Sequence, residues 1–283
     1  MSNDQGECSP LDHLVINTIF DLDLAVSQFH ELGFTLTPRG YHSFGSMNNL
    51  IIFDNHYIEL IGLPQDTDKL GSILLNSPTG INALVLRTSN ADNIYETLTD
   101  KGFQTEKPIL GSRPIHINGQ EQLVKFRVVH LSKGQFDSGR IYFCEHYTPE
   151  LVWRQEWQKH ANGVQRIREL ICISDQPEIE AGRYARAIGT TIANQTTRIF
   201  LNDFLISIIS FNAYYERYGQ LACDSAGRTS FFGAIVFQVA HLDMVRKFLD
   251  SNKNDMQHVE HSTNRSLVLL SKFNTLIEFV ENQ

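Results

Sequence analysis

Two residues that can bind metal or move protons, His13 and Glu59, lie in two short apolar segments near the N-terminus. The segments are Leu11-Asp-His-Leu-Val-Ile16 and Tyr57-Ile-Glu-Leu60. A histidine nitrogen and a carboxylate oxygen on neighbouring strands can bind a divalent ion and leave positions open for water or substrate. The same two groups can equally form only a hydrogen bond. His13 and Glu59 therefore mark the best candidate site, and the pair alone does not decide its chemistry.

Both segments are predicted to be strands, because they are short, apolar and β-prone. Successive side chains of a strand point to opposite faces. His13 should then face the same side as Glu59, into a concave surface. The aliphatic residues of the opposite face should pack under a helix, and they are Leu14, Ile16, Ile58 and Leu60.

The first segment recurs three more times along the chain, beginning at Ile81, Ile167 and Phe232. The third positions of the four copies are His13, Ala83, Glu169 and Ala234. Each copy is followed by a helical pattern, at about 22–32, 91–101, 177–188 and 242–250, and the first three patterns end near Gly33, Gly102 and Gly189. Further strands follow each helix, so the repeat predicts an α+β chain of four β-α-β-β-β units that pair to cover their sheets.

The second copy offers another carboxylate, because its last strand, Ile141-Tyr-Phe-Cys-Glu145, ends in Glu145. By alternation Phe143 shares the face of Glu145, and His146 points the opposite way. We expect Glu145 and Phe143 to face the cavity. In the first copy, His42 and Asn49 are either exposed loop groups or hydrogen-bond donors at the cavity mouth.

Other polar residues of the chain are expected to have no role in the site. The histidines assigned to the surface are His56, His116, His130, His160, His241, His258 and His261. In the C-terminal half, Glu169 is expected to be solvated or ion-paired, and Glu278 is either a surface-edge carboxylate or a cavity group.

The composition excludes several classes of protein. A net charge of -8 and a pI near 5.7, without a basic stripe, argue against a nucleic-acid partner. The four cysteines show no paired spacing, which predicts neither a disulfide framework nor a zinc knuckle. No segment is predicted to target or span a membrane, and a cytoplasmic protein is expected.

The order of motifs resembles the vicinal-oxygen-chelate superfamily, and in particular its glyoxalase-like domain proteins. The resemblance rests on LDHLVI at 11–16, DLDLAVSQFHELGFTLTPRGYH at 21–42, NNLIIF at 48–53, YIELIG at 57–62, CEHYTPELVWRQEWQKHANG at 144–163 and LIEFVE at 276–281. It implies two glyoxalase/bleomycin-resistance-like curved sheets. The N-terminal domain would be 1–155, with modules 11–62 and 80–147, and the C-terminal domain 156–283, with modules 166–215 and 231–281.

The resemblance also implies a metal site and an activity. The ligands would be His13, Glu59 and Glu145, although Ala83 stands where many active members supply another ligand. The ion would be Zn, Ni, Mn or Fe, and it would polarise a small vicinal-oxygen substrate for enediolate chemistry as a lyase or isomerase. Glu145 or Glu59 would be the catalytic base, and His42, Asn49 and Phe143 would contact the substrate.

Two other functions remain open at this point. One is a metal-free protein of the same fold that binds or sequesters a small organic molecule. The other is a ring-cleaving dioxygenase, which would need a second histidine at a matching strand position. The expected partner in every case is a small molecule, and a homodimer is a possible assembly.

Overall fold

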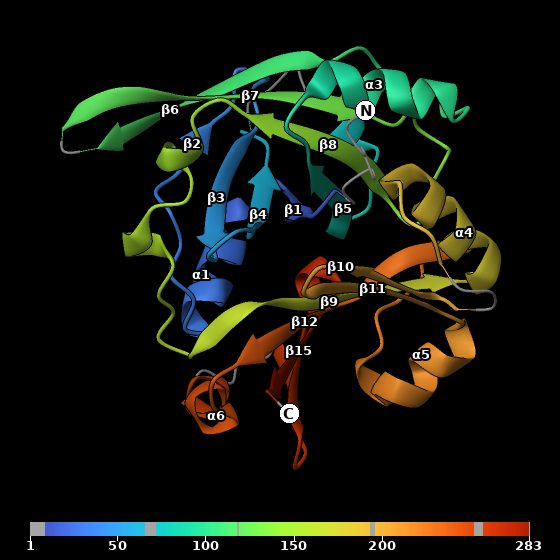
Figure 1. Ribbon diagram of the computed structural model, residues 1–283. Helices are drawn as coiled ribbons and strands as arrows, with labels where there is room; N and C mark the ends of the chain where they lie inside the picture. The colour runs from blue at the N-terminus through green and yellow to red at the C-terminus, as the bar shows by residue number, and fades with distance from the viewer. Residues whose placement is uncertain (1–8, 66–71, 118, 193–195, 252–256, 283) are drawn as a thin grey trace.

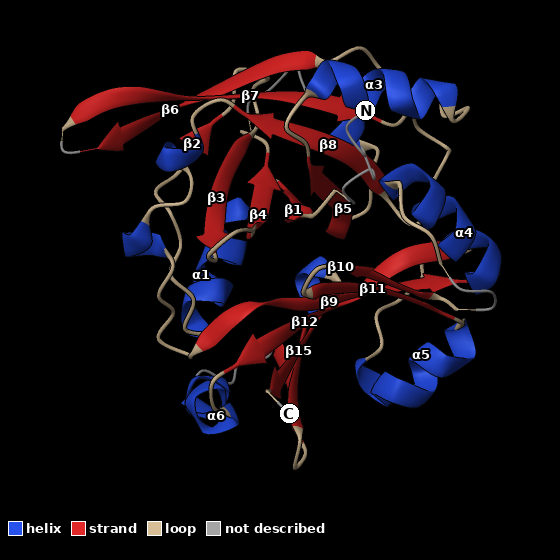
Figure 2. Cartoon of the chain, in the orientation of Figure 1, coloured by secondary structure: helices blue, strands red, loops and turns tan. Residues whose placement is uncertain are grey.

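The computed structural model describes residues 9–65, 72–117, 119–192, 196–251 and 257–282, which form two mixed β-sheets (Figure 1). The first sheet has the strand order β2-β3-β4-β1-β5-β8-β7-β6, and the second has β10-β11-β9-β12-β15-β14-β13. Short helices lie around the two sheets (Figure 2). The predicted α+β architecture of paired repeats is therefore confirmed.

Two copies of the repeat build the first sheet. The elements of the first copy are β1 (Leu11–Ile19), α1 (Leu22–Glu31), β2 (Gly40–Tyr41), β3 (Met47–Ile52) and β4 (Tyr57–Gly62). A short helix, α2 (Ser72–Leu75), leads to the second copy. Its elements are β5 (Gly80–Arg87), α3 (Ala91–Asp100), β6 (Ile109–Ile117), β7 (Gln120–His130) and β8 (Arg140–His146).

The other two copies build the second sheet. The elements of the third copy are β9 (Val164–Ser174), α4 (Pro177–Ile188), β10 (Arg198–Leu201) and β11 (Phe204–Ile209), followed by helix α5 (Phe211–Tyr218). The elements of the fourth are β12 (Ser230–Val239), α6 (Leu242–Ser251), β13 (Gln257–His261), β14 (Arg265–Leu270) and β15 (Thr275–Glu281). The third copy differs from the others, because two described strands rather than three follow its helix.

The first strand of each copy organises its sheet. β1 pairs parallel with β4, the last strand of its own copy, and antiparallel with β5, the first strand of the next. β9 pairs in the same way with β11 and β12. Equivalent residues of the paired copies therefore meet at the middle of each sheet.

One continuous hydrophobic core lies between the two sheets. It contains Leu14 and Ile58 of the first sheet together with Ile235 and Phe237 of the second, and Phe29 of α1 packs into it. All four aliphatic residues predicted to lie under the helix belong to this core. The opposite face of the first sheet, which carries His13 and Glu59, therefore points away from the core.

The helices end as the glycines predict. Gly33, Gly102 and Gly189 lie one or two residues beyond α1, α3 and α4 and have φ angles of 84°, 80° and 85°. This left-handed conformation is strained for residues with a Cβ atom. Within the described chain, every helix is too short or too polar to cross a membrane.

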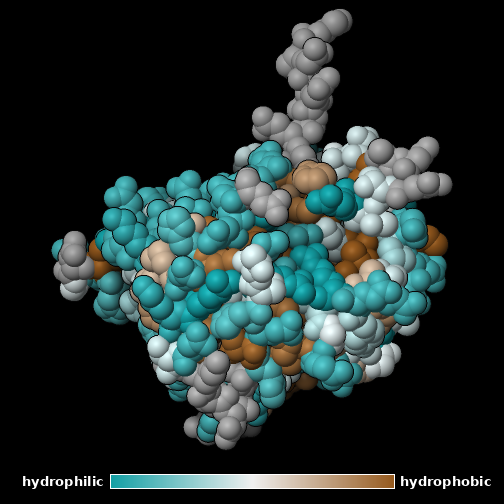
Figure 3. Space-filling view, turned by 90° about the horizontal axis from the view of Figure 1, so that it is seen from below, coloured by the Kyte–Doolittle hydropathy of each residue, from teal (hydrophilic) through white to brown (hydrophobic). Residues whose placement is uncertain are grey.

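In the second sheet, helix α5 covers the face that corresponds to the cavity face of the first. Tyr214 and Tyr218 of α5 are buried against β9 and β12 residues such as Ile171 and Val236. Glu278 is buried and accepts hydrogen bonds from the Tyr218 hydroxyl and Arg217 Nη2, each at 2.7 Å. This side of the molecule is mostly hydrophilic, with smaller apolar areas (Figure 3).

Both carboxylates of the second sheet have partners. Glu169 forms a hydrogen bond with Ser207 and lies 3.7 Å from Arg217 Nη2, which agrees with the ion-paired alternative. Glu278 is an inward-facing group rather than an edge carboxylate. Beside α5 this face keeps a polar pocket that Glu169, Arg217 and Glu278 line, whereas the mostly apolar cavity found among the described residues lies on the first sheet.

Candidate functional site

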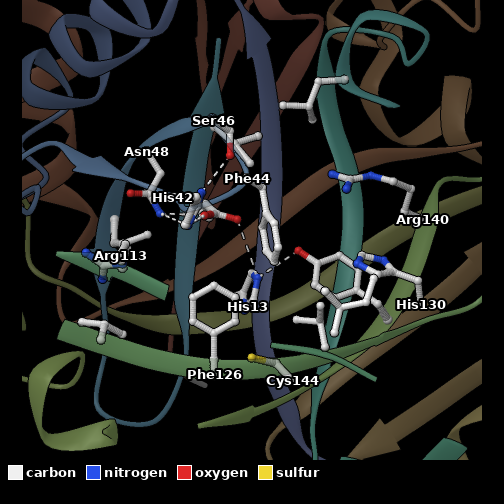
Figure 4. A pocket seen from close by; sticks show the side chains of 18 of the residues that line it. His13, His42, Phe44, Ser46, Asn48, Arg113, Phe126, His130, Arg140 and Cys144 are labelled. Carbon is white, nitrogen blue, oxygen red and sulfur yellow. Dashed lines mark hydrogen bonds and ion pairs between the residues drawn. The ribbon is translucent and has the colours of Figure 1, made fainter. Parts of the chain in front are cut away.

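A cavity of about 370 Å³ lies on the face of the first sheet that points away from the core. Most of its lining side chains are apolar, and polar groups gather around His13 (Figure 4). His13, His42 and Glu59, all singled out from the sequence, line it together. A mostly apolar cavity with a few convergent polar groups is the usual form of a small-molecule site.

His13 is oriented by its neighbour Asp12, which sits at an irregularity of β1 between Leu11 and His13. Asp12 is fully buried, and its carboxylate accepts hydrogen bonds from His13 Nδ1 at 2.7 Å, Arg87 Nε at 3.0 Å and His146 Nε2 at 3.1 Å. Burial raises the pKa of Asp12, but the charge of His146 and hydrogen bonds from both histidines outweigh it and hold the pKa well below its ordinary value. Asp12 is therefore an ionised hydrogen-bond acceptor.

This arrangement assigns the two nitrogens of His13. Because Nδ1 donates to Asp12, Nε2 is the acceptor of the neutral ring and faces the cavity. Nε2 lies 3.2 Å from the Tyr142 hydroxyl and 3.8 Å from Glu59 Oε2. Burial raises the pKa of Tyr142 well above its ordinary value, so its hydroxyl stays protonated and can donate. The Tyr57 ring stacks on the imidazole with ring centroids 4.3 Å apart.

Glu59 is held by a second polar group of the first copy. Asn48 Nδ2 donates to Glu59 Oε1 at 2.7 Å, and His42 Nε2 lies 3.5 Å from the same oxygen. Burial raises the pKa of Glu59, but His42, His13, the Asn48 hydrogen bond and Arg113 together lower it below its ordinary value. Burial lowers the pKa of His42, although the charge of Glu59 opposes this effect.

The repeat shows which residues occupy equivalent places in the site. In the first copy Glu59 pairs with Val15, two residues after His13. In the second copy the residue two after Ala83 is Val85, and its partner on β8 is Tyr142. Tyr142 therefore occupies the place that corresponds to Glu59. The four equivalent positions hold a histidine, a carboxylate, a methyl group and a phenol.

The prediction that Glu145 and Phe143 face the cavity is wrong. Phe143 is fully buried in the core between the sheets, and Glu145 Oε2 accepts a hydrogen bond from the Ala91 N–H at the start of α3, at 3.1 Å. The two residues do share one face of β8, as expected, but it is the helix-covered face. Alternation then places Tyr142, Cys144 and His146 on the cavity side, where they line it.

Of two neighbouring asparagines, Asn48 rather than the predicted Asn49 lines the cavity. Asn49 does not line the cavity, because its amide bonds to the Thr37 carbonyl at 2.8 Å and accepts from Arg39 Nε at 2.7 Å. Asn48 takes its place beside Glu59. His42 does reach the cavity, where Nδ1 lies 2.8 Å from Ser46 Oγ.

Of the histidines expected at the surface, two are buried and one lines the cavity. His130 lines the cavity, and burial lowers its pKa to about 4. His56 and His160 are only 4% and 8% exposed and connect segments that lie far apart in the sequence. His56 Nε2 accepts a hydrogen bond from the Ile167 N–H at 2.9 Å, and His160 Nδ1 accepts one from the Thr35 N–H at 3.1 Å.

The ligand set implied by the family resemblance does not fit this cavity. Ala83 offers no ligand atom, Glu145 faces the other way, and Tyr142 keeps its proton, which leaves His13 and Glu59. A different group, Asp12, Cys144 and His146, does bring its ligand atoms within 4.8 Å of one another. The Asp12 carboxylate there is already bound by Arg87, and burial raises the pKa of the Cys144 thiol well above its ordinary value.

The structure is one of paired β-α-β-β-β modules with a mostly apolar cavity on one sheet. The chain matches the glyoxalase-like domain family over residues 11–188, more than half of its length. It therefore belongs to the glyoxalase-like domain family, and the predicted resemblance to the vicinal-oxygen-chelate superfamily is confirmed. None of the curated proteins matches the sequence significantly.

Solved structures with low identity share the fold. A hypothetical protein from Staphylococcus aureus has 14% identity and a TM-score of 0.63, and the match covers 96% of this chain and 99% of the other. A mutant of 4-hydroxymandelate synthase from Streptomyces coelicolor has 9% identity and a TM-score of 0.54, covering 96% and 93%. A fusion of a xylose isomerase-like TIM barrel with 4-hydroxyphenylpyruvate dioxygenase has 11% identity and a TM-score of 0.57, covering 96% and 48%. At these identities the likeness concerns the fold.

Proposed function

We propose that the protein is an enzyme that moves a proton on the carbon next to a carbonyl group of a small substrate, as an isomerase or lyase. One observation carries the proposal. In the wall of a mostly apolar cavity, His13 Nε2 faces the open space, the buried Asp12 carboxylate lies 2.7 Å from Nδ1, and the Tyr142 hydroxyl lies 3.2 Å from Nε2. A base, a group that orients it and a nearby proton donor are the parts that such chemistry needs.

The proposed step balances without another reactant. His13 Nε2 takes the proton from the carbon, and the C–H electron pair forms the new C=C bond of the enolate. The C=O π pair moves to oxygen, where the Tyr142 hydroxyl turns to donate a hydrogen bond. Asp12 and Glu59 stabilise the imidazolium that His13 becomes. Return of the proton to the same or a neighbouring atom gives the isomer, and loss of a β-substituent gives the lyase product.

The direct test follows exchange of substrate protons with solvent. We would incubate the protein in D₂O with pyruvate, 4-methyl-2-oxopentanoate, phenylpyruvate and hydroxyacetone, and follow loss of the C–H signals next to the carbonyl by proton NMR. At least one probe should exchange faster than in buffer, and the His13→Asn variant should not accelerate it. Probes that bind and raise the melting temperature but never exchange would contradict the enzyme and favour the metal-free binding protein.

A prediction on metal follows from the donor set. Because His13 and Glu59 alone remain of the expected ligands, dialysis against EDTA should change the exchange rate by less than about twofold, and Zn, Ni, Mn or Fe(II) should not raise it. The rates would be measured on the same NMR assay before and after chelation. Loss of exchange with EDTA and recovery with one of these ions would instead support the metal-dependent lyase or isomerase.

A further inference from the structure

Arg113 of β6 is a buried cation in the cavity wall. Its side chain lines the cavity, and the residue is only 4% exposed. Among the residues that the structure describes, its guanidinium has no hydrogen bond or ion pair, and its Nη2 is completely buried. An ionised group buried in this way costs free energy unless an opposite charge or acceptor joins it.

Glu59, the carboxylate that acts most directly on Arg113, is not that partner. Glu59 acts on Arg113 through space, but its carboxylate is bound by Asn48 and lies beside His13 and His42. Burial lowers the pKa of Arg113, and the opposing effects of Tyr57 and Glu59 do not restore it. An arginine stays charged even when its pKa falls. The charge therefore remains to be neutralised by something that enters the cavity.

The position of the guanidinium is set by the chain around it. Arg113 pairs with Val124 across the β6–β7 ladder. A Cβ atom added at Gly40 would lie 3.1 Å from Arg113 Nη1 and 2.3 Å from Asn48 Oδ1, so only glycine leaves room for both groups there. The β2 backbone at Gly40 thus packs closely against the guanidinium of Arg113, whose side chain also lines the cavity.

The charges of the cavity wall indicate the charge of the ligand. Arg113 and Arg140 are its cations, and Figure 4 shows them on opposite sides of His13. Glu59 is its one buried acid among the described residues, since Glu106 lies on the exposed rim. The charge of His146, which also lines the cavity, is balanced by the ionised Asp12 beside it. The two arginines and Glu59 then leave one positive charge, which a monoanion neutralises and a dianion exceeds.

We propose that Arg113 binds the carboxylate of the substrate, which is a small monocarboxylate with an apolar body. The guanidinium donates to the carboxylate oxygens, and the apolar body lies against Val124 and Phe126 beside it. This inference rests on the proposed function, because it names the substrate class of the same cavity. Bidentate arginine–carboxylate pairing would also orient the carbonyl end of the molecule toward His13.

Binding separates this inference from catalysis. Isothermal titration would compare 4-methyl-2-oxopentanoate with the neutral 4-methyl-2-oxopentanamide, and with inorganic phosphate as a dianionic arm. Wild-type protein should bind the acid at least about tenfold more tightly than the amide or phosphate. Arg113→Met should bind acid and amide equally, whereas Arg127→Met, which loses an ion pair with Asp92 on the surface, should keep the preference. The His13→Asn variant should also keep it, even though it loses exchange.

Stability of the ligand-free protein gives a second readout. Removing an unpaired buried charge should raise the melting temperature of Arg113→Met by about 2–4 °C, whereas loss of a structural arginine would lower it. Equal binding of acid and amide by the wild-type protein, tighter binding of phosphate, or a lowered melting temperature for Arg113→Met would overturn the proposal. Acid preference without proton exchange would reject the proposed function and leave this inference standing.

Discussion

Replacing His13 by Asn should lower the rate of carbonyl-adjacent proton exchange by about 100- to 10,000-fold, the range typical of losing a general base. Asn can still donate a hydrogen bond to Asp12, so the neighbourhood of that buried carboxylate is preserved. It has no nitrogen lone pair to take the proton. The measurement is the NMR exchange assay, performed with the probe that wild-type protein turns over fastest.

Two further variants make the result specific to His13. His30→Asn replaces an exposed histidine of α1 and should leave the rate unchanged. Tyr142→Phe removes the hydroxyl 3.2 Å from Nε2 and should reduce the rate by a smaller factor, because it removes oxygen stabilisation while the base remains. Full exchange in His13→Asn would show that another group takes the proton, and the mechanism would fail.

The architecture could be predicted from the sequence because the same strand and helix pattern recurs four times along the chain. Each first strand, helix and terminal glycine repeats at nearly the same spacing, so a weak local pattern is confirmed by its copies. The direction of His13 and Glu59, toward the concave face of the sheet, was predictable for the same reason. Leu14 and Ile58 had to enter the core, and alternation then left the polar residues on the other face.

The errors at the site have one physical origin. Alternation groups residues by face, but it does not say which face is inward when both faces carry apolar residues. On β8 the Phe143 face and the Tyr142 face are equally plausible locally, and only the pairing of β8 with β5 decides between them. The fully buried Asp12 was missed because the strand irregularity that lets it reach His13 breaks the period of two.

The positions of Arg113 and of the interior histidines are set by contacts between residues that lie even farther apart in the sequence. Arg113 lines the cavity from β6, the edge strand of the first sheet, and no nearby sequence motif marks it. His56 and His160 lie where the two sheets meet, and their partners are backbone groups more than 100 residues away. A repeat pattern describes each module but not the packing of one pair against the other.

Those two histidines lead to the second large effect, a loss of stability as the pH falls from about 6.5 to 4. Burial lowers the pKa of His56 and of His160 to about 4. Each ring accepts a backbone N–H through one nitrogen, so protonation would set two donors against each other. Between pH 4 and 6.5 these histidines therefore bind protons in the unfolded chain but not in the folded chain. Stability is present above this window and is lost as the pH falls through it.

The expected slope is about 1.4 kcal/mol per pH unit for each such histidine, and His130, whose pKa is also about 4, adds to it. Urea unfolding at half-unit steps from pH 7 to 4.5 measures the slope. In the His56→Gln, His160→Gln double variant, the new side chains can accept and donate hydrogen bonds but cannot titrate. The slope of its unfolding free energy against pH should therefore fall by the contribution of two histidines. His116→Gln, at an exposed histidine, should keep the wild-type slope. An unchanged slope in the double variant would mean that these rings do not stay neutral, and that the contacts between the two sheets tolerate a charge.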